Sequence, residues 1–121
     1  MKQKVHSVSY LAKAEFELKN GVYDLVALPS GAEVVKVSLE VVGNPNSGEI
    51  SVGFEDETNK NYFLTLENIS SAKVATSARD YTATSNKVVV TEVKKFVNNG
   101  EHVKGVLRVL YFLPSVIEVE Y

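Results

Sequence analysis

Apolar and polar residues alternate along most of this chain, and the alternation is clearest between residues 33 and 42. Its apolar positions are Val35, Val37, Leu39 and Val41, and its polar positions are Lys36, Ser38 and Glu40. A period of two predicts a half-buried β-strand. The strand follows a short corner, Leu28-Pro29-Ser30-Gly31-Ala32, whose proline and glycine are typical of a turn. We treat this corner and strand as the element around which the chain is organised.

Weaker alternation predicts further strands at residues 5–11, 13–18, 22–27, 50–54, 62–66, 87–96, 105–112 and 117–121. Asn20-Gly21 is a two-residue hairpin signal and predicts that the strands on either side of it pair. Residues 98–100 predict a similar turn between the strands at 87–96 and 105–112. Residues 105–112 are apolar on both faces, which places them at the centre of a sheet.

Residues 67–86 form the least regular part of the chain because they are rich in small residues. Alanines at positions 72, 75 and 78 are compatible with one or two helical turns, and Val74 is compatible with a short strand. Our interpretation is a long connection between two sheets.

Eight to nine short strands, with turns every ~8–12 residues and no long amphipathic helix, are typical of a sandwich or a barrel. Because most connections are expected to be hairpins, the sheets should be antiparallel. We therefore expect an all-β fold, an antiparallel β-sandwich of jelly-roll-like form. Residues 1–121 are expected to form a single domain, with residues 1–12 and 114–121 as candidate arms.

The two chain ends carry the candidate interface residues. In the C-terminal strand, Ile117, Val119 and Tyr121 fall on one face. This strand is either the last strand of its own sandwich or a strand added to a neighbour's sheet. The N-terminal strand near Val8 and Tyr10 has the same two alternatives. The candidate interface therefore consists of Val8, Tyr10, Val116, Ile117, Val119 and Tyr121.

Composition narrows the class of protein without indicating a reaction. The chain has 121 residues, a formal net charge of −2 and no cysteine, so it has neither disulfides nor thiol chemistry. Its 13 basic residues are scattered, and the pI is near 5.7, so we expect no nucleic-acid partner. No apolar run approaches the ~20 residues of a membrane span, so we expect no membrane partner.

Candidate chemistry is sparse. His6 and His102 have no metal-site spacing, and we expect both at the surface. The acidic run Glu55-Asp56-Glu57 has a calcium loop as its functional alternative, but it lacks the pattern of an EF-hand, and a solvated hairpin tip is favoured. Neither a Gly-x-Ser-x-Gly motif nor a Gly-rich phosphate loop occurs. We therefore expect no catalytic residue, no metal site and no cofactor.

Three tyrosines are candidates for a sugar-stacking surface. They are Tyr10, Tyr81 and Tyr121, and packing in a core or an interface is the favoured alternative for each. A carbohydrate- or receptor-binding module is therefore the second functional hypothesis.

Between residues 23 and 111 the chain resembles small β-sandwich virion structural proteins of tailed bacteriophages and prophages. Their pattern combines an extended segment, a Leu-Pro-x-Gly-Ala corner, a strand of alternating valines, a Val-Gly strand and a closing Gly-x-x-x-Val-x-Tyr strand. The matching residues are Tyr23, Leu25, 28–32, Val35, Val37, Leu39, Val52-Gly53, 62–66, 70–78, 88–91 and 105–111.

The resemblance implies a non-enzymatic component of the virion, either a head decoration or head-fibre protein or a part of the tail. The implied partners are the protein itself, as a homo-oligomer and most simply a trimer, together with capsid or tail proteins. It also implies location in the virion after synthesis in the cytoplasm of the bacterial host. Such a protein would attach through exposed strand edges and terminal arms.

Overall fold

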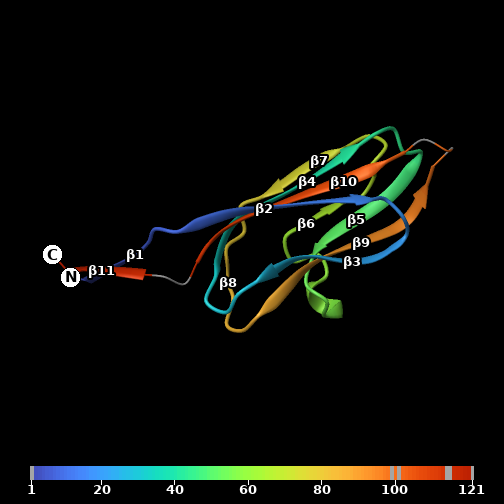
Figure 1. Ribbon diagram of the computed structural model, residues 1–121. Coiled ribbons are helices and arrows are strands. Elements are labelled where there is room, and N and C mark those ends of the chain that lie inside the picture. The colour runs from blue at the N-terminus through green and yellow to red at the C-terminus, as the bar shows by residue number, and fades with distance from the viewer. Residues whose placement is uncertain (1, 99, 101, 114–115, 121) are drawn as a thin grey trace.

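The computed structural model describes residues 2–98, 100, 102–113 and 116–120, which form an all-β fold with two packed antiparallel sheets (Figure 1). The first sheet has the order β2 (Ser9–Glu17), β10 (Lys104–Phe112), β4 (Glu33–Val42) and β7 (Val74–Ser77), and β8 (Tyr81–Thr82) also pairs with β4. The second sheet has the order β3 (Gly21–Leu28), β9 (Lys87–Val97), β5 (Ser47–Gly53) and β6 (Leu64–Leu66). The expected β-sandwich is confirmed.

The core lies between the two sheets and consists mostly of valine, leucine and isoleucine at alternate strand positions. Leu39 of β4 and Leu107 of β10 are completely buried on the first sheet, and Ile50 of β5 is completely buried on the second. β10 pairs with β2 on one side and with β4 on the other. The central position predicted for residues 105–112 is therefore confirmed.

Several connections cross from one sheet to the other, which corrects the hairpins expected from the sequence. β2 pairs with β10 and β3 pairs with β9, so Asn20-Gly21 joins the two sheets instead of closing a hairpin. The Asn20 side chain binds β9, because its Oδ1 accepts a 2.8 Å hydrogen bond from Phe96 N and its Nδ2 donates a 3.2 Å bond to Phe96 O. The turn after Val97 likewise connects β9 to a strand of the other sheet. This crossing order is compatible with a jelly-roll arrangement of Greek keys.

The corner at residues 28–32 carries the chain from the second sheet to the first. Gly31 has a φ of 88°, a conformation that glycine adopts without the steric cost of a side chain. Its N–H donates a 2.6 Å hydrogen bond to Ala83 O, and Ala83 N donates a 2.9 Å bond to Ala32 O. Ala32 and Ala83 are both buried, so the corner is fixed to the segment that follows β8.

β4 contains a bulge at Val35, which corrects the alternation predicted for residues 33–42. The register pairs Lys36 with Leu110 and then Val34 with Tyr111, so Val35 has no partner on β10. Val34 is therefore completely buried in the core, whereas Val35 is only half-buried. An inserted residue exchanges the two faces of a strand, and two consecutive valines give no sign of it in the sequence.

The polar segment at residues 55–61 connects β5 to β6, which pair with each other, and it contains the short 3₁₀ turn η1 (Glu57–Asn59). The predicted connection at this tip is therefore confirmed. Residues 67–86 are all described and hold β7 and β8 but no helix, so the short-strand alternative near Val74 is the one observed.

An aromatic cluster packs beside this segment and consists of Phe54, Tyr62, Phe63 and Tyr81. The ring centroids of Phe54 and Tyr81 lie 4.6 Å apart, and the Arg79 guanidinium lies 3.8 Å from the centroid of the Tyr62 ring. Tyr81, one of the candidate sugar-stacking tyrosines, is therefore packed against other aromatic rings.

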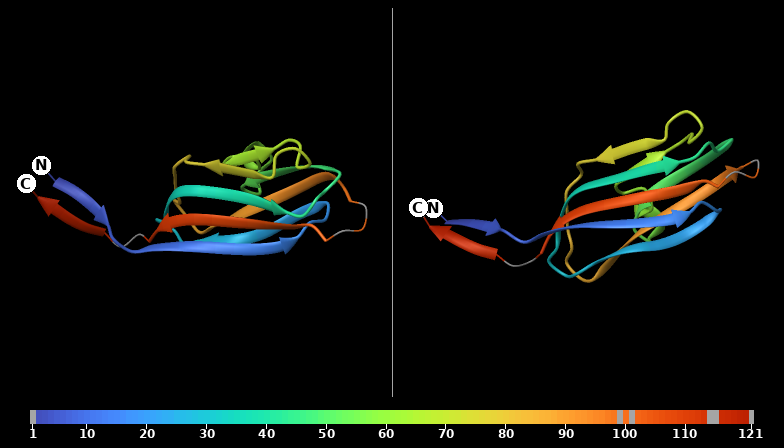
Figure 2. Two further views of the ribbon diagram at one scale, coloured as in Figure 1. Left: turned by 90° about the horizontal axis from the view of Figure 1, so that it is seen from above. Right: turned by 45° about the horizontal axis from the view of Figure 1, so that its top comes forward.

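Two strands lie outside the sandwich. Among the described residues, β1 (Lys2–His6) and β11 (Val116–Glu120) pair only with each other, in an antiparallel ribbon that runs from Lys2↔Glu120 to His6↔Val116. The ribbon projects from the end of the sandwich at which β2 begins and β10 ends (Figures 1 and 2). The C-terminal strand thus pairs with the N-terminal strand, and the strand predicted at residues 5–11 is divided between β1 and β2.

Candidate functional site

A groove of about 490 Å³ lies where the ribbon meets the sandwich. It is lined by Gln3, Lys4, Val5, His6, Glu33, Val35 and Phe112. The bulge of β4 contributes Val35 to this groove, and β10 contributes its last residue, Phe112. His6 Nδ1 lies 3.3 Å from Leu113 O, which ties the last residue of β1 to the end of β10. The groove combines apolar side chains with both signs of charge.

Exposed apolar side chains gather beside this groove, at the start of β2. Val8 is 39%, Tyr10 is 53% and Leu11 is 61% exposed. The Tyr10 ring packs edge-on against the buried Tyr111 at a centroid distance of 6.0 Å, and Leu113 N donates a 2.8 Å hydrogen bond to Val8 O. We call the segment Val8–Leu11 the apolar patch. Its side chains lie on both faces of the sheet, because Tyr10 packs against the buried Tyr111 whereas Leu11 lines a pocket with Leu110 and Arg108 on the outer face. Its backbone is held by β10, while its side chains remain accessible.

The outer edge of β2 is the longest regular free edge among the described strands of the sandwich. β2 has nine residues and pairs on one side only, with β10. The other edges are short or irregular, because β6, β7 and β8 have two to four residues each and β3 is bulged between Asp24 and Val26. Free edges present unpaired N–H and C=O groups to another chain.

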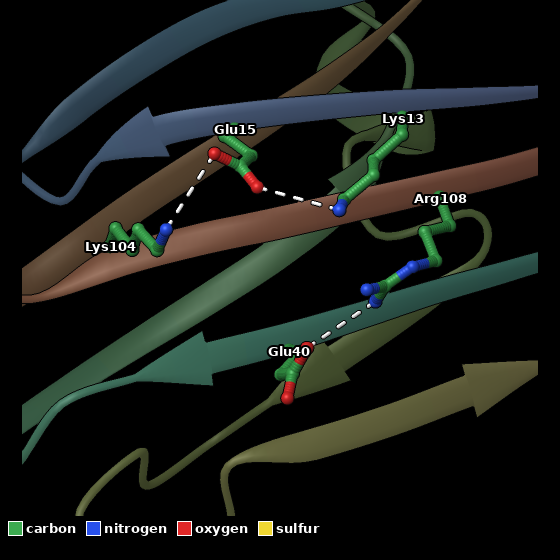
Figure 3. A network of polar contacts seen from close by, with 5 residues as sticks. All are labelled: Lys13, Glu15, Glu40, Lys104 and Arg108. Carbon is green, nitrogen blue, oxygen red and sulfur yellow. Dashed lines mark hydrogen bonds and ion pairs between the residues drawn. The ribbon is translucent and has the colours of Figure 1, made fainter.

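Two groups of ion pairs lie on the outer face of the first sheet (Figure 3). Glu15 of β2 lies between Lys13 Nζ at 3.5 Å and Lys104 Nζ at 3.6 Å, and Arg108 Nη1 lies 3.3 Å from Glu40 Oε1. The positive charge of Lys104 and then that of Lys13 lower the pKa of the Glu15 carboxyl group. All of these side chains are at least a third exposed, so each pair adds little stability and mainly fixes the pattern of charge.

A second ion-pair group lies on the outer face of the other sheet. Lys60 Nζ lies 3.3 Å and Lys94 Nζ 3.2 Å from the two carboxylate oxygens of Glu92, whose side chain is 13% exposed. Burial raises the pKa of Glu92, but the hydrogen bonds from Lys94 and Lys60 outweigh it, so the pKa lies below its ordinary value. A shallow polar depression of about 350 Å³ surrounds these residues.

A further pocket of about 450 Å³ lies where β2 ends and β10 begins and is lined in part by Glu15, Glu17 and His102. His102 Nδ1 lies 3.9 Å from Glu17 Oε1, and the His102 side chain is 97% exposed. Over the part of the chain that the structure describes, no group of three His, Asp or Glu residues could hold a metal ion. No described helix is long and apolar enough to cross a membrane.

Two residues of the predicted interface, Val8 and Tyr10, lie near the groove, and so do three residues that the sequence did not single out: Leu11, Val35 and Phe112. Val8 and Tyr10 lie in the same exposed segment as Leu11, whose side chain lies on the outer face of the sheet beside Leu110. Val35 and Phe112 line the groove only because of the bulge and the β10 terminus. Val116, Ile117 and Val119 lie in β11 of the ribbon, whereas Tyr121 lies outside the described residues.

No protein-family model and no curated protein matches the chain. Among solved structures, the chain is similar to a chain of the acid-stable capsid structure of Helicobacter pylori bacteriophage KHP30, with 75% identity and a TM-score of 0.89. The similarity covers 100% of both chains. It also resembles a chain of the cyanophage Pam1 capsid asymmetric unit, at 17% identity, with 88% of this chain and 85% of that one covered and a TM-score of 0.68. A chain of the Ralstonia phage GP4 capsid has 15% identity, coverage of 92% and 88%, and a TM-score of 0.60. The last two similarities concern the fold alone.

Proposed function

The chain belongs to the same family as the Helicobacter pylori bacteriophage KHP30 capsid chain to which it is 75% identical, and from this we propose that it is a capsid decoration protein. In this proposal it is a structural component of a phage virion. It binds the outer surface of the capsid lattice, associates with copies of itself and carries out no catalysis. Its domain is the sandwich, and its terminal segments act as an arm.

The observation that supports this function best is that surfaces able to bind another protein gather at one end of the molecule. The free edge of β2, the apolar patch Val8–Leu11, the groove and the ribbon all lie at or extend from this end. A lattice protein needs such a surface because it must bind neighbouring proteins repeatedly. Ion pairs also lie on the outer faces of both sheets.

Co-sedimentation with capsids that lack the protein tests this proposal. Leu11→Lys places a charge in the apolar patch, and we expect it to weaken capsid binding at least about tenfold, which corresponds to ~1.4 kcal/mol of lost contact energy. Val74→Lys is the matched control, because Val74 is similarly exposed (63% against 61%) and lies on the opposite edge strand of the same sheet.

The control should bind capsids as tightly as the unchanged protein does. Failure of the unchanged protein to bind any capsid surface would refute a decoration role. Equal loss in the two variants would show that the patch is not the binding surface.

A further inference from the structure

The outer face of the first sheet carries a small pocket beside the apolar patch. Paired residues of antiparallel strands lie on the same face, and faces alternate along a strand, so the register gives the neighbours on this face. Across β2, β10 and β4, one row consists of Leu11, Leu110 and Lys36, and the next consists of Lys13, Arg108 and Ser38. The pocket has a volume of about 230 Å³ and is lined by Leu11, Lys36, Ser38, Arg108 and Leu110. We call it the outer-face pocket.

Two positive charges are paired directly with each other beside this pocket. Lys13 of β2 lies opposite Arg108 of β10, and like charges in such a pair destabilise a sheet. Both side chains turn toward carboxylates of the next row (Figure 3), with Lys13 Nζ 3.5 Å from Glu15 Oε1 and Arg108 Nη1 3.3 Å from Glu40 Oε1. Glu15 also pairs with Lys104, whose Nζ lies 3.6 Å away. The cations of this group therefore outnumber its carboxylates.

Lys36 is the second cation that lines the pocket, and it has no carboxylate of its own. It is exposed, and its side chain forms no ion pair or hydrogen bond with a described residue. The next carboxylate of β4 toward the ribbon belongs to Glu33, which lies beyond the bulge and accepts a hydrogen bond from Thr82 Oγ1. The pocket therefore combines a surplus of positive charge with the apolar walls that Leu11 and Leu110 provide.

The size and chemistry of the pocket favour one side chain of a larger partner as its occupant. Sites for free small molecules measure roughly 300–1,000 Å³, and this pocket is smaller. A protein carboxylate matches the two cations, whereas a phosphate backbone would leave the two leucines uncovered. Leu11 also belongs to the apolar patch, so a partner that covers the patch reaches the pocket as well.

We infer that the outer-face pocket binds an aspartate or glutamate carboxylate of the capsid protein, with apolar residues beside that carboxylate packed on Leu11 and Leu110. This contact rests on the capsid binding in the proposed function and specifies its chemistry. The ammonium group of Lys36 pairs with one carboxylate oxygen. Arg108 binds the other, because its guanidinium has five N–H donors and the bond to Glu40 uses one of them. The bound carboxylate also offsets the repulsion within the like-charged pair.

Reversal of one charge tests the pocket by co-sedimentation with capsids that lack the protein. Lys36→Glu places a carboxylate where the partner's carboxylate binds, and we expect capsid binding to weaken at least about tenfold. Lys36→Gln only removes the charge and should weaken binding about threefold. Because Lys36 is exposed, the melting temperature of both variants should stay within about 2 °C of that of the unchanged protein.

Lys19→Glu is the matched control, because it makes the same change in net charge. Lys19 is also an exposed lysine whose side chain has no ion pair with a described residue. It lies between β2 and β3, at the opposite end of the sandwich from the ribbon (Figure 1). This control should bind capsids as tightly as the unchanged protein does.

The salt dependence of binding distinguishes an ion pair from an apolar contact. Raising NaCl from ~0.1 M to ~1 M shortens the distance over which charges act from about 10 Å to about 3 Å. The advantage of the unchanged protein over Lys36→Gln should therefore disappear at the higher salt concentration. An equal advantage at both concentrations would show that Lys36 does not act through its charge and would overturn the inference.

Carbodiimide coupling identifies the group that Lys36 meets. The reagent joins a lysine amine to a carboxylate in contact with it as an amide and leaves as a urea, so no spacer remains. In decorated capsids that are coupled, digested and analysed by mass spectrometry, we expect an amide between Lys36 Nζ and an aspartate or glutamate of the capsid protein, and none at Lys19. An amide between Lys36 and a second copy of this chain would show that the occupant is another copy and would overturn the inference.

The outcomes separate this contact from the proposed function. If the unchanged protein binds capsids but Lys36→Glu binds equally tightly, or if Lys36 forms no amide with the capsid protein, the pocket is not the contact and the decoration role stands. Equal losses in Lys36→Glu and Lys19→Glu would indicate an effect of net charge and would also overturn the pocket. If the unchanged protein binds no capsid, the decoration role fails, and the contact fails with it.

Discussion

Gly53 at the end of β5 is the position where a single methyl group should disturb the sandwich most. A Cβ atom built on Gly53 would overlap Asn59 O and would lie 2.6 Å from Tyr62 N and 2.7 Å from Lys60 C. These are all backbone atoms of the tip that connects β5 to β6. No side-chain rotation can relieve the overlap, so Gly53→Ala must move the tip itself.

The tip has little freedom to move. Phe54 N donates a 2.8 Å hydrogen bond to Asn59 O, and Tyr62 N donates a 3.1 Å bond to the same oxygen. Phe54 and Tyr62 also belong to the aromatic cluster. Overpacking a core costs ~1–3 kcal/mol, and because only backbone can yield here, we expect the upper end, about 3 kcal/mol. At ~4 °C per kcal/mol for a domain of this size, the melting temperature should fall by about 12 °C.

Gly105→Ala is the matched comparison. Its added Cβ would meet Phe16 Cζ at 2.5 Å and Phe16 Cε1 at 2.6 Å, which are atoms at the far end of a half-buried side chain that can rotate away. We expect a loss of about 1 kcal/mol and a fall of about 4 °C. Thermal unfolding followed by circular dichroism measures both variants. If Gly53→Ala costs no more than Gly105→Ala, the inference of a rigid tip is wrong.

Three further predictions concern charge, the crossing connection and the apolar patch. Because the folded pKa of Glu92 lies below its ordinary value of 4.5, its ion pairs stabilise the fold above pH 4.5, and this stabilisation is lost as pH falls through the folded pKa. Glu92→Gln should therefore lower the free energy of unfolding by about 0.5–1 kcal/mol at pH 7 and should leave it unchanged in strong acid. Urea unfolding measures this at both pH values, and an equal difference between variant and unchanged protein at the two would contradict the prediction. Asn20→Ala removes both hydrogen bonds to Phe96 and should cost about 1 kcal/mol, measured by urea unfolding, with an unchanged midpoint as the contrary result. Tyr10→Ser removes an exposed ring and should weaken capsid binding while shifting the melting temperature by less than about 4 °C, and a larger shift would assign Tyr10 to the core instead.

The elements of this fold were predictable from the sequence, but their partners were not. Alternation correctly indicated a strand at residues 33–42, and apolar residues on both faces correctly indicated a central strand at 105–112, because a face that is buried needs apolar side chains. Asn20-Gly21 showed where the chain turns. It could not show that the next strand enters the opposite sheet, because that depends on Phe96, 76 residues away in the chain.

The candidate site was predictable only where it coincides with the chain ends. The groove depends on an unpaired valine in β4, and Val34-Val35 looks the same in sequence whether or not a bulge divides them. The ribbon depends on pairing between residues 2–6 and 116–120, which no local pattern reports. Leu11 escapes notice because an apolar residue in an alternating strand is normally assigned to the core.

The pairing of β2 with β10 sets a limit on when this protein can fold during its synthesis. Among the described strands of the first sheet, residues 9–17 pair only with residues 104–112, which are made much later in synthesis. β10 lies between β2 and β4 in the sheet and pairs with both. Until β10 has left the ribosome, β2 and β4 therefore cannot be part of one sheet. The nascent chain must therefore carry β2 and β4 without β10 while the residues between them and β10 are made, and β10 then joins both strands in one event. Formation of such distant contacts is slow, and open strand edges promote aggregation, so slower synthesis at low temperature should raise the soluble yield.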